Sequence, residues 1–177
     1  MISPAEREFA VMQLDQTRDA LLRLLHGLSR DQLLYRCDPA RWSIGENVEH
    51  LMLVEKRLVG GITKTLETLP DPSRRCAMSD SGVLHVVANV EQALESPPNF
   101  QPELRWPAES LPREFEVVRQ HSRHFVCTVD GDLRRHFIPH PFYGDFDCYQ
   151  WLLVIGAHCH RHTAQSEAVK AHHSFPH

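Results

Sequence analysis

The sequence lacks a long hydrophobic run, because no stretch approaches the roughly 18 uninterrupted apolar residues that a membrane-spanning helix needs. Its N-terminal residues, MISPAEREFAVMQLDQ, also lack the basic start and apolar core of a secretion signal. We therefore predict a cytoplasmic protein that does not bind a membrane. A basic excess is missing too, since the formal net charge is −4, and we expect no nucleic-acid partner.

The cysteines lack the paired spacing of a disulfide or zinc framework. There are five of them, an odd number, and no two form a CxxC pair. With no secretion signal, this pattern favours free thiols over a disulfide-bonded scaffold.

Histidine, by contrast, is abundant: the chain has 13 in 177 residues. The length fits a single domain over residues 1–177, because domains commonly run to about 100–200 residues. So many imidazoles suggest a metal site. Three of them, His172, His173 and His177, lie in the C-terminal stretch AHHSFPH, and from about residue 171 we expect a disordered tail.

Capping boxes and helical spacing of apolar residues predict four long helices. They run from Ser3 to about His26, from Ser43 to about Leu66, from Ser110 to about Asp130, and from Asp147 to about residue 171. A further box at Ser29 predicts one or two extra turns after the first long helix.

Residues 71–110 are the least regular part of the chain, with several prolines around one predicted helix from Leu84 to Leu94. A connection of this length inside a compact domain is typical of a lid or a crossover. The sequence shows no strand pattern, and we read HFIPHPFYGDF as a loop. We therefore predict an all-α four-helix bundle with a long crossover between the second and third long helices.

The last helix contains the stretch GAHCHRHTAQ, which has three histidines within five residues. Residues four apart on a helix are offset by only about 40°, so His158 and His162 stack on one face while His160 points away. That face continues the apolar side of Val154 and Ile155 and is aimed at the bundle interior. An H-x-x-x-H pair suits zinc or a similar ion, whereas surface or hydrogen-bonded core histidines are the alternative.

A third imidazole can come from the second long helix, where His50 lies on the inward face one turn after Glu46. Bundle metal sites are built from side chains on facing helices in this way. Three neutral histidines leave a coordination position open to water or substrate, which is typical of a catalytic ion, whereas a structural zinc takes four protein ligands.

Several other side chains have two interpretations. Glu46 could orient His50 or act as a general base, or it could only complete the capping box of Ser43. Cys159 could be a nucleophile, although an inert thiol is favoured because nothing marks an oxyanion site. His121 and His124 could share a face of the third long helix, and a solvated or hydrogen-bonded pair is favoured there. His136 or His140, in the loop before the last helix, could approach the open side of the metal site.

WSIGENVEH and HCHRHTAQ resemble the DinB-like superfamily, whose members share a metal-binding four-helix bundle. The matching positions are Trp42, Glu46, His50, His158, Arg161, His162 and Gln165. The resemblance implies His50, His158 and His162 as metal ligands and an up-down-down-up order of helices. It does not indicate one particular reaction, because the superfamily includes thiol-dependent S-transferases, a mycothiol-dependent isomerase, domains of ergothioneine-forming enzymes and many members without known activity.

We therefore expect a metal-dependent enzyme, either a hydrolase or a small-thiol S-transferase, with a small-molecule substrate such as a low-molecular-weight thiol. The expected ion is divalent; zinc is favoured, and nickel, iron or cobalt would also accept three imidazoles. The alternative is a non-catalytic helical protein stabilised by metal. We expect a homodimer in either case.

Overall fold

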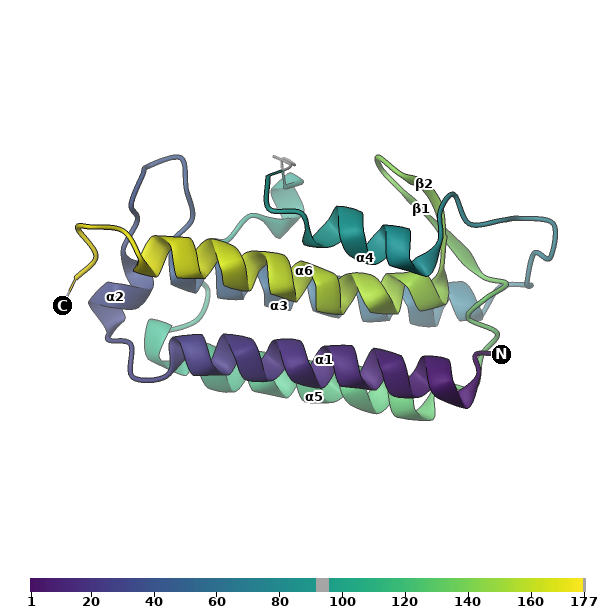
Figure 1. Ribbon diagram of the computed structural model, residues 1–177. Coiled ribbons are helices and arrows are strands. Elements are labelled where there is room, and N and C mark those ends of the chain that lie inside the picture. Colours follow the sequence, from purple (N-terminus) through teal and green to yellow (C-terminus); the bar gives the residue numbers. More distant parts are fainter. Residues whose placement is uncertain (92–95, 177) are drawn as a thin grey trace.

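The computed structural model describes residues 1–91 and 96–176, and this part of the chain is mostly helical (Figure 1). The helices are α1 (Pro4–Leu25), α2 (Arg30–Leu34), α3 (Ile44–Leu66), α4 (Asp80–Ala88), α5 (Leu111–Thr128) and α6 (Cys148–Lys170). Two short 3₁₀ turns, η1 (Pro98–Phe100) and η2 (Ala108–Ser110), precede α5, and a small hairpin of β1 (Phe137–His140) and β2 (Gly144–Asp147) precedes α6.

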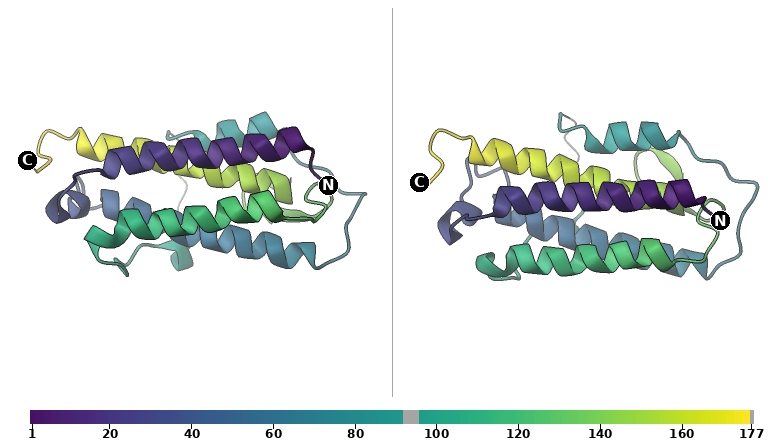
Figure 2. Two further views of the ribbon diagram at one scale, coloured as in Figure 1. Left: turned by 90° about the horizontal axis from the view of Figure 1, so that it is seen from below. Right: turned by 60° about the horizontal axis from the view of Figure 1, so that its bottom comes forward.

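The four long helices form a bundle in which α1 and α3 each pack against both α5 and α6 (Figure 2). The Tyr149 hydroxyl donates to the Glu6 carbonyl at 2.9 Å, and the Cys159 thiol meets the Thr17 carbonyl at 3.6 Å further along both helices. α1 and α6 therefore run in the same direction. Figure 1 shows α3 and α5 beginning at the opposite end of the bundle.

Helix α6 is buried on nearly all sides, because its first half, CYQWLLVIGA, is apolar all round instead of on one stripe. It contacts α1, α3 and α4. Gly156 allows α1 to approach closely, since a Cβ atom there would lie 3.3 Å from the Cβ atom of Gln13. This packing places the histidines that follow Gly156 inside the molecule.

The predicted starts of the four long helices are confirmed, three of them with a side-chain cap; α5 begins at Leu111, directly after the predicted Ser110, without one. Ser3, Ser29 and Ser43 each form a complete capping box, in which the serine hydroxyl accepts a backbone N–H and a Glu or Gln side chain reaches back. The carboxylate of Asp147 accepts from the backbone N–H of Gln150 at 2.7 Å. The ends of the four long helices lie within a few residues of the predicted ones.

The helix predicted from Leu84 to Leu94 was placed wrongly. Helix α4 begins at Asp80, because the Ser79 side chain accepts the backbone N–H of Gly82 at 3.1 Å and so caps an earlier turn. The helix ends at Ala88, and residues 92–94 of the prediction lie outside the described residues.

The prediction of a chain without strands was also wrong. β1 and β2 pair antiparallel, with Phe137 opposite Asp147 and His140 opposite Gly144. Each strand has only four residues and β1 contains a proline, so neither shows the alternation that marks a strand in a sequence. The indole N–H of Trp151 fastens the hairpin to α6 by donating to the Ile138 carbonyl at 2.9 Å.

The tail is ordered as far as residue 176, where disorder was expected. Phe175 is buried and packs edge-on against Tyr35, whose hydroxyl hydrogen-bonds the ring of His172 at 2.8 Å. The Gln32 side chain donates to the Pro176 carbonyl at 2.9 Å. These contacts fold the tail back onto α2, which composition could not reveal. His177 lies outside the described residues.

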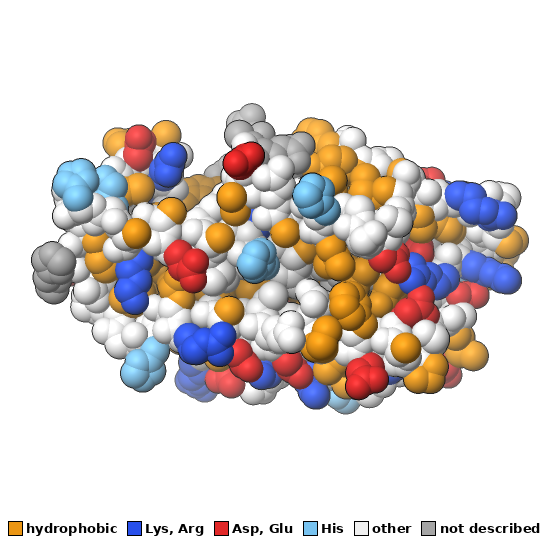
Figure 3. Space-filling model, viewed as in Figure 1, with side chains coloured by type: hydrophobic (Ala, Val, Ile, Leu, Met, Phe, Trp, Pro, Cys, Tyr) orange, Lys and Arg blue, Asp and Glu red, His pale blue; other side chains and the backbone are white. Residues whose placement is uncertain are grey.

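Two further expectations concern the surface and the cysteines. All five cysteines are free thiols, as predicted. Within the described residues, no helix is both long and apolar enough to cross a membrane. Acidic and basic side chains are interspersed on the face drawn in Figure 3, and no large basic patch forms on that face.

A buried ion pair links three of the four long helices. The guanidinium of Arg119 on α5 donates to both carboxylate oxygens of Glu55 on α3, at 2.9 and 3.0 Å. The same guanidinium donates to the Leu14 carbonyl and the Thr17 hydroxyl on α1, at 2.6 and 2.9 Å. Both charged side chains are almost inaccessible, 0% and 3% exposed. The pair therefore fixes how α1, α3 and α5 meet.

Glu55→Gln is expected to lower the free energy of unfolding by about 3–5 kcal/mol, because it leaves the Arg119 cation buried without an anion. Urea unfolding followed by circular dichroism measures this. Glu8→Gln is the control, since Glu8 is exposed on α1 and surface changes stay within about 0.5 kcal/mol. A loss below about 1 kcal/mol for Glu55→Gln would contradict the role given to the pair.

Candidate metal centre

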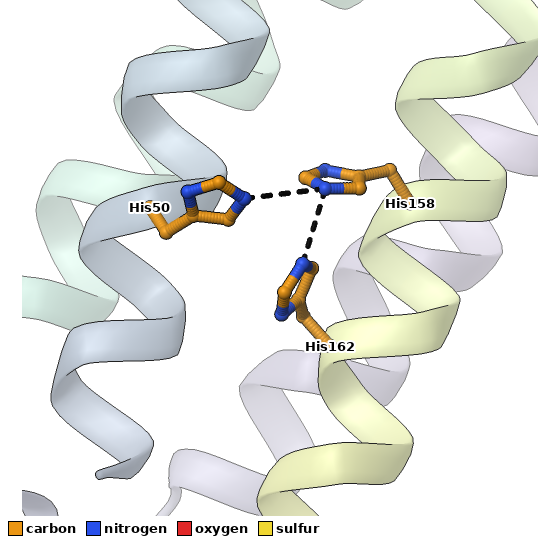
Figure 4. Close-up of side chains that lie close together, drawn as sticks. All are labelled: His50, His158 and His162. Atoms are coloured by element: carbon orange, nitrogen blue, oxygen red, sulfur yellow. Dashed lines mark hydrogen bonds between the residues drawn. The ribbon is translucent and has the colours of Figure 1, made fainter. Parts of the chain in front are cut away.

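Three imidazole rings converge between α3 and α6 (Figure 4). His50 extends from α3, and His158 and His162 extend from successive turns of α6. The Nε2 atom of His158 lies 3.3 Å from Nε2 of His50 and 3.1 Å from Nε2 of His162. The structure thus brings together the three histidines that the sequence predicts as ligands.

Two of the three distances between these nitrogens match the dimensions of a tetrahedral zinc site. Zinc binds imidazole nitrogen at about 2.0–2.1 Å, so two ligands of a tetrahedron lie about 3.3 Å apart. The three ligand atoms all lie within 4.8 Å of one another. The donor set therefore fits a divalent ion of this size without a large rearrangement.

A hydrogen bond to the crossover segment decides which ring nitrogen carries the proton of His50. Its Nδ1 atom lies 2.8 Å from the carbonyl oxygen of Phe100, at the end of η1. A carbonyl oxygen can only accept a hydrogen bond, so Nδ1 carries the proton. In the neutral ring, Nε2 is then an unprotonated lone pair that points toward His158.

Asn47, one turn before His50 on α3, fixes the proton of His162. Its side-chain nitrogen donates to the Ser43 carbonyl at 3.0 Å, which orients the amide. Its side-chain oxygen therefore faces Nδ1 of His162, at 2.8 Å, and accepts the proton of that ring. The Nε2 atom of His162 is a second lone pair directed at the centre of the cluster.

These two bonds leave the cluster with more lone pairs than protons. His158 can place one proton on its Nε2 atom and can donate it to only one of its two neighbours. At least one buried lone pair then lacks a donor within the cluster, which is costly in a dry interior. A divalent cation satisfies all three nitrogens at once, and fixed Nδ1–H bonds of this kind are typical partners of metal-binding histidines.

Burial keeps all three rings neutral. His50 and His162 are buried and His158 is half-buried. Burial lowers the pKa of His50, and it lowers the pKa of His158 and His162 well below the usual range. Neighbouring imidazoles and the Arg161 cation lower the pKa of His158 and His162 further. Neutral rings are the form that binds metal, so protons compete weakly with an ion here.

Trp42, in the turn before α3, covers one side of the cluster. Its ring centroid lies 4.7 Å from that of His50 and 6.0 Å from that of His162, and it stacks on the latter. An apolar cover of this kind limits water at the rings and so favours their neutral form.

Glu46 is committed to holding the start of α3. Its carboxylate accepts the backbone N–H of Ser43 at 2.8 Å and forms an ion pair with Arg36. Burial alone would raise the pKa of Glu46, but the hydrogen bonds from Arg36 and Ser43 lower it. Among the described residues, no hydrogen bond joins this carboxylate to the three histidines. The capping interpretation therefore accounts for its contacts, and its role as a base stays a prediction.

The remaining histidines of interest lie outside the cluster. His121 and His124 are exposed on α5, as the solvated interpretation predicts, and His160 is exposed on α6. The buried ring of His136 bridges the Asp132 and Thr68 carbonyls, at 2.8 and 3.0 Å. His140 stacks on Trp151 in the hairpin, with ring centroids 5.3 Å apart. None of these five rings belongs to the group of potential ligands among the described residues.

Three other positions of GAHCHRHTAQ have identifiable surroundings. Cys159 is fully buried, and burial raises the pKa of its thiol, which keeps it protonated and unreactive. The buried Arg161 side chain donates to the Asn89 carbonyl, at 2.5 Å, at the end of α4. The Gln165 side chain opposes the lowering of the pKa of His162.

Sequence reasoning missed the two groups that fix the imidazole protons. Asn47 could have been noticed, because it is a polar residue three positions before His50 and therefore on nearly the same face of the helix. The carbonyl of Phe100 could not, because it is a backbone atom whose position depends on the path of the crossover.

The fold and the three imidazoles define a helical-bundle protein with a candidate three-histidine metal centre. The chain belongs to the DinB superfamily, whose sequence profile matches residues 13–166. It is similar to the uncharacterized protein YuaE of Bacillus subtilis strain 168, with 23% identity over 147 residues, which is 82% of this chain and 88% of that protein. No solved structure gave a significant match.

The lowered pKa values predict how the stability of the metal-free protein depends on pH. The unfolded chain takes up protons at its histidines below about pH 6.5, while the folded cluster does not. The free energy of unfolding should therefore fall as the pH drops below about 6.5, by at most about 1.4 kcal/mol per pH unit for each proton taken up.

Urea unfolding at pH 7.5, 6.5 and 5.5, in the presence of a chelator, measures this dependence. His162→Gln should flatten it, because one depressed histidine is removed. His160→Gln changes an exposed histidine of the same helix and should leave it unchanged. An equally steep dependence in His162→Gln and in the unmodified protein would show that the cluster is not its source.

Proposed function

We propose that the protein binds one divalent metal ion per chain through Nε2 of His50, His158 and His162. The convergence of three neutral, buried imidazoles carries this proposal, because two of their Nδ1 protons are already committed to oxygen acceptors. Membership of the DinB superfamily supports it. Zinc is the favoured ion, and nickel, iron or cobalt would fit the same donors.

We propose further that the site is catalytic, since three protein ligands leave a coordination position open. When bound, the ion supplies a Lewis acid that either lowers the pKa of a water molecule toward about 7 or stabilises the thiolate of a small thiol. The chain's own residues hold the site in shape: Phe100 and Asn47 orient two rings, and Trp42 excludes water from one side.

His158 is half-buried, whereas His50 and His162 are buried, and this favours an approach from the side of His158. A substrate would approach there. The proposed reaction is hydrolysis or transfer of a small thiol to a small-molecule substrate. The second candidate is a non-catalytic protein, in which the ion stabilises the helices and the chain forms a homodimer; the three histidines lie on two different helices, α3 and α6, which a stabilising ion would join.

His50→Ala is expected to abolish stoichiometric metal binding, because two imidazoles from one helix remain. The unmodified protein, stripped and reloaded with zinc, should hold about one ion per chain by atomic spectroscopy, as three ligands predict. His160→Ala removes an exposed histidine two residues from His158 and should bind metal normally. A protein that takes up no metal under any loading condition would overturn the proposal.

The melting temperature of His50→Ala separates the catalytic from the structural function. A catalytic ion held by a preformed site predicts loss of metal with a small change in melting temperature. A structural ion predicts a large loss, because the binding free energy then contributes to folding. A screen for turnover with small thiols and with hydrolysable esters distinguishes the two proposed reactions.

A further inference from the structure

We propose that Glu49 is a positioning residue of the metal centre: it holds the crossover segment 100–105 so that the Phe100 carbonyl keeps the proton of His50 on Nδ1. The expected effect on metal affinity rests on the proposed function. The role of Glu49 in fixing the His50 proton does not require a metal and can be tested without one.

The carboxylate of Glu49 is completely buried, and within the described part of the chain it accepts hydrogen bonds from this segment alone. It accepts the backbone N–H of Glu103 at 3.0 Å and that of Arg105 at 3.1 Å. The guanidinium of Arg105 donates to it as well, at 2.5 Å. A buried carboxylate is tolerated only when it is paired in this way, and here the partners belong to a loop that has little regular structure of its own.

The segment needs such an anchor because it contains an unfavourable backbone conformation. Leu104 has a φ of 57° and is the one non-glycine residue with positive φ in the described part of the chain. Its side chain is 45% exposed, so burial does not hold it in place. The two N–H groups that Glu49 accepts lie directly on either side of Leu104. The carboxylate therefore stabilises a turn that leucine rarely adopts.

The same segment reaches His50 at its other end. The Arg105 side chain also donates to the Gln101 carbonyl at 3.2 Å, which ties residue 105 back to the end of η1. The neighbouring Phe100 carbonyl then meets Nδ1 of His50 at 2.8 Å. Two consecutive residues of α3 therefore hold segment 100–105 at two points. Glu49 accepts two backbone N–H groups of the segment, and His50 donates to its Phe100 carbonyl.

Loss of the hydrogen bonds to Glu49 should weaken the hydrogen bond between His50 and the Phe100 carbonyl. If segment 100–105 relaxes, the Phe100 carbonyl moves from Nδ1 and the His50 ring is free to carry its proton on Nε2 instead. That proton would have to leave before Nε2 could bind a metal. Groups that fix ligand histidines in this way commonly change metal affinity by about 10–100-fold.

Glu49→Gln tests the inference, because an amide has one oxygen and presents an NH₂ group where a backbone N–H needs an acceptor. In the metal-free protein, ¹⁵N NMR of the imidazole rings should show His50 protonated only on Nδ1. In Glu49→Gln it should show a mixture of the two tautomers. Zinc affinity, measured by competition with a chromophoric chelator, should fall by about 10–100-fold with one ion still bound.

Two control variants separate positioning from general stability. Glu103→Gln makes the same chemical change at a side chain that is 67% exposed and pairs with the same Arg105, and it should behave as the unmodified protein. Glu55→Gln removes a buried carboxylate from the same helix without touching the segment. It should lose stability while His50 keeps its proton on Nδ1.

A Glu49→Gln protein that shows the unmodified His50 spectrum and zinc affinity overturns the inference. If the unmodified protein binds no zinc, the proposed function fails, and the tautomer comparison still decides the role of Glu49. If Glu49→Gln does not fold, Arg105→Gln replaces it, since Arg105 is 34% exposed. Arg105→Gln should shift the tautomer and affinity in the same direction by a smaller amount, and no shift overturns the inference.

Discussion

The placement of two protons constrains the centre of this molecule. The Nδ1–H groups of His50 and His162 are directed at oxygen acceptors, so their Nε2 lone pairs must face His158. Three features maintain this arrangement: α3 supplies Asn47, the crossover supplies the Phe100 carbonyl, and burial keeps the rings neutral. Such a group of acceptors is unfavourable alone and favourable around a cation.

The residues that stabilise the bundle are different from those that form the candidate metal centre. Along α6, residues up to Ala157 belong to one apolar cluster, whereas Cys159 and Val169 belong to another, and His158 lies between them. The buried pair of Glu55 and Arg119 joins the other three long helices. The three-histidine cluster therefore lies at the junction of two apolar clusters.

The sequence predicted the elements whose signals are local. Capping boxes at Ser3 and Ser43 placed helix starts, and the four-residue spacing of His158 and His162 placed two rings on one face. What it could not predict depends on contacts between distant segments. The four-residue strands of the hairpin are held by pairing and by Trp151, the tail is held by Tyr35, and the Phe100 carbonyl is held by a loop whose path no periodicity describes.

The proposed chemistry depends on the number and kind of ligands on the ion. X-ray absorption of the zinc-loaded protein measures both directly. We expect three imidazole nitrogens at about 2.0–2.1 Å and at least one further light ligand from solvent or substrate. A sulfur shell at about 2.3 Å, which would mean a cysteine ligand, or fewer than three imidazoles would contradict it.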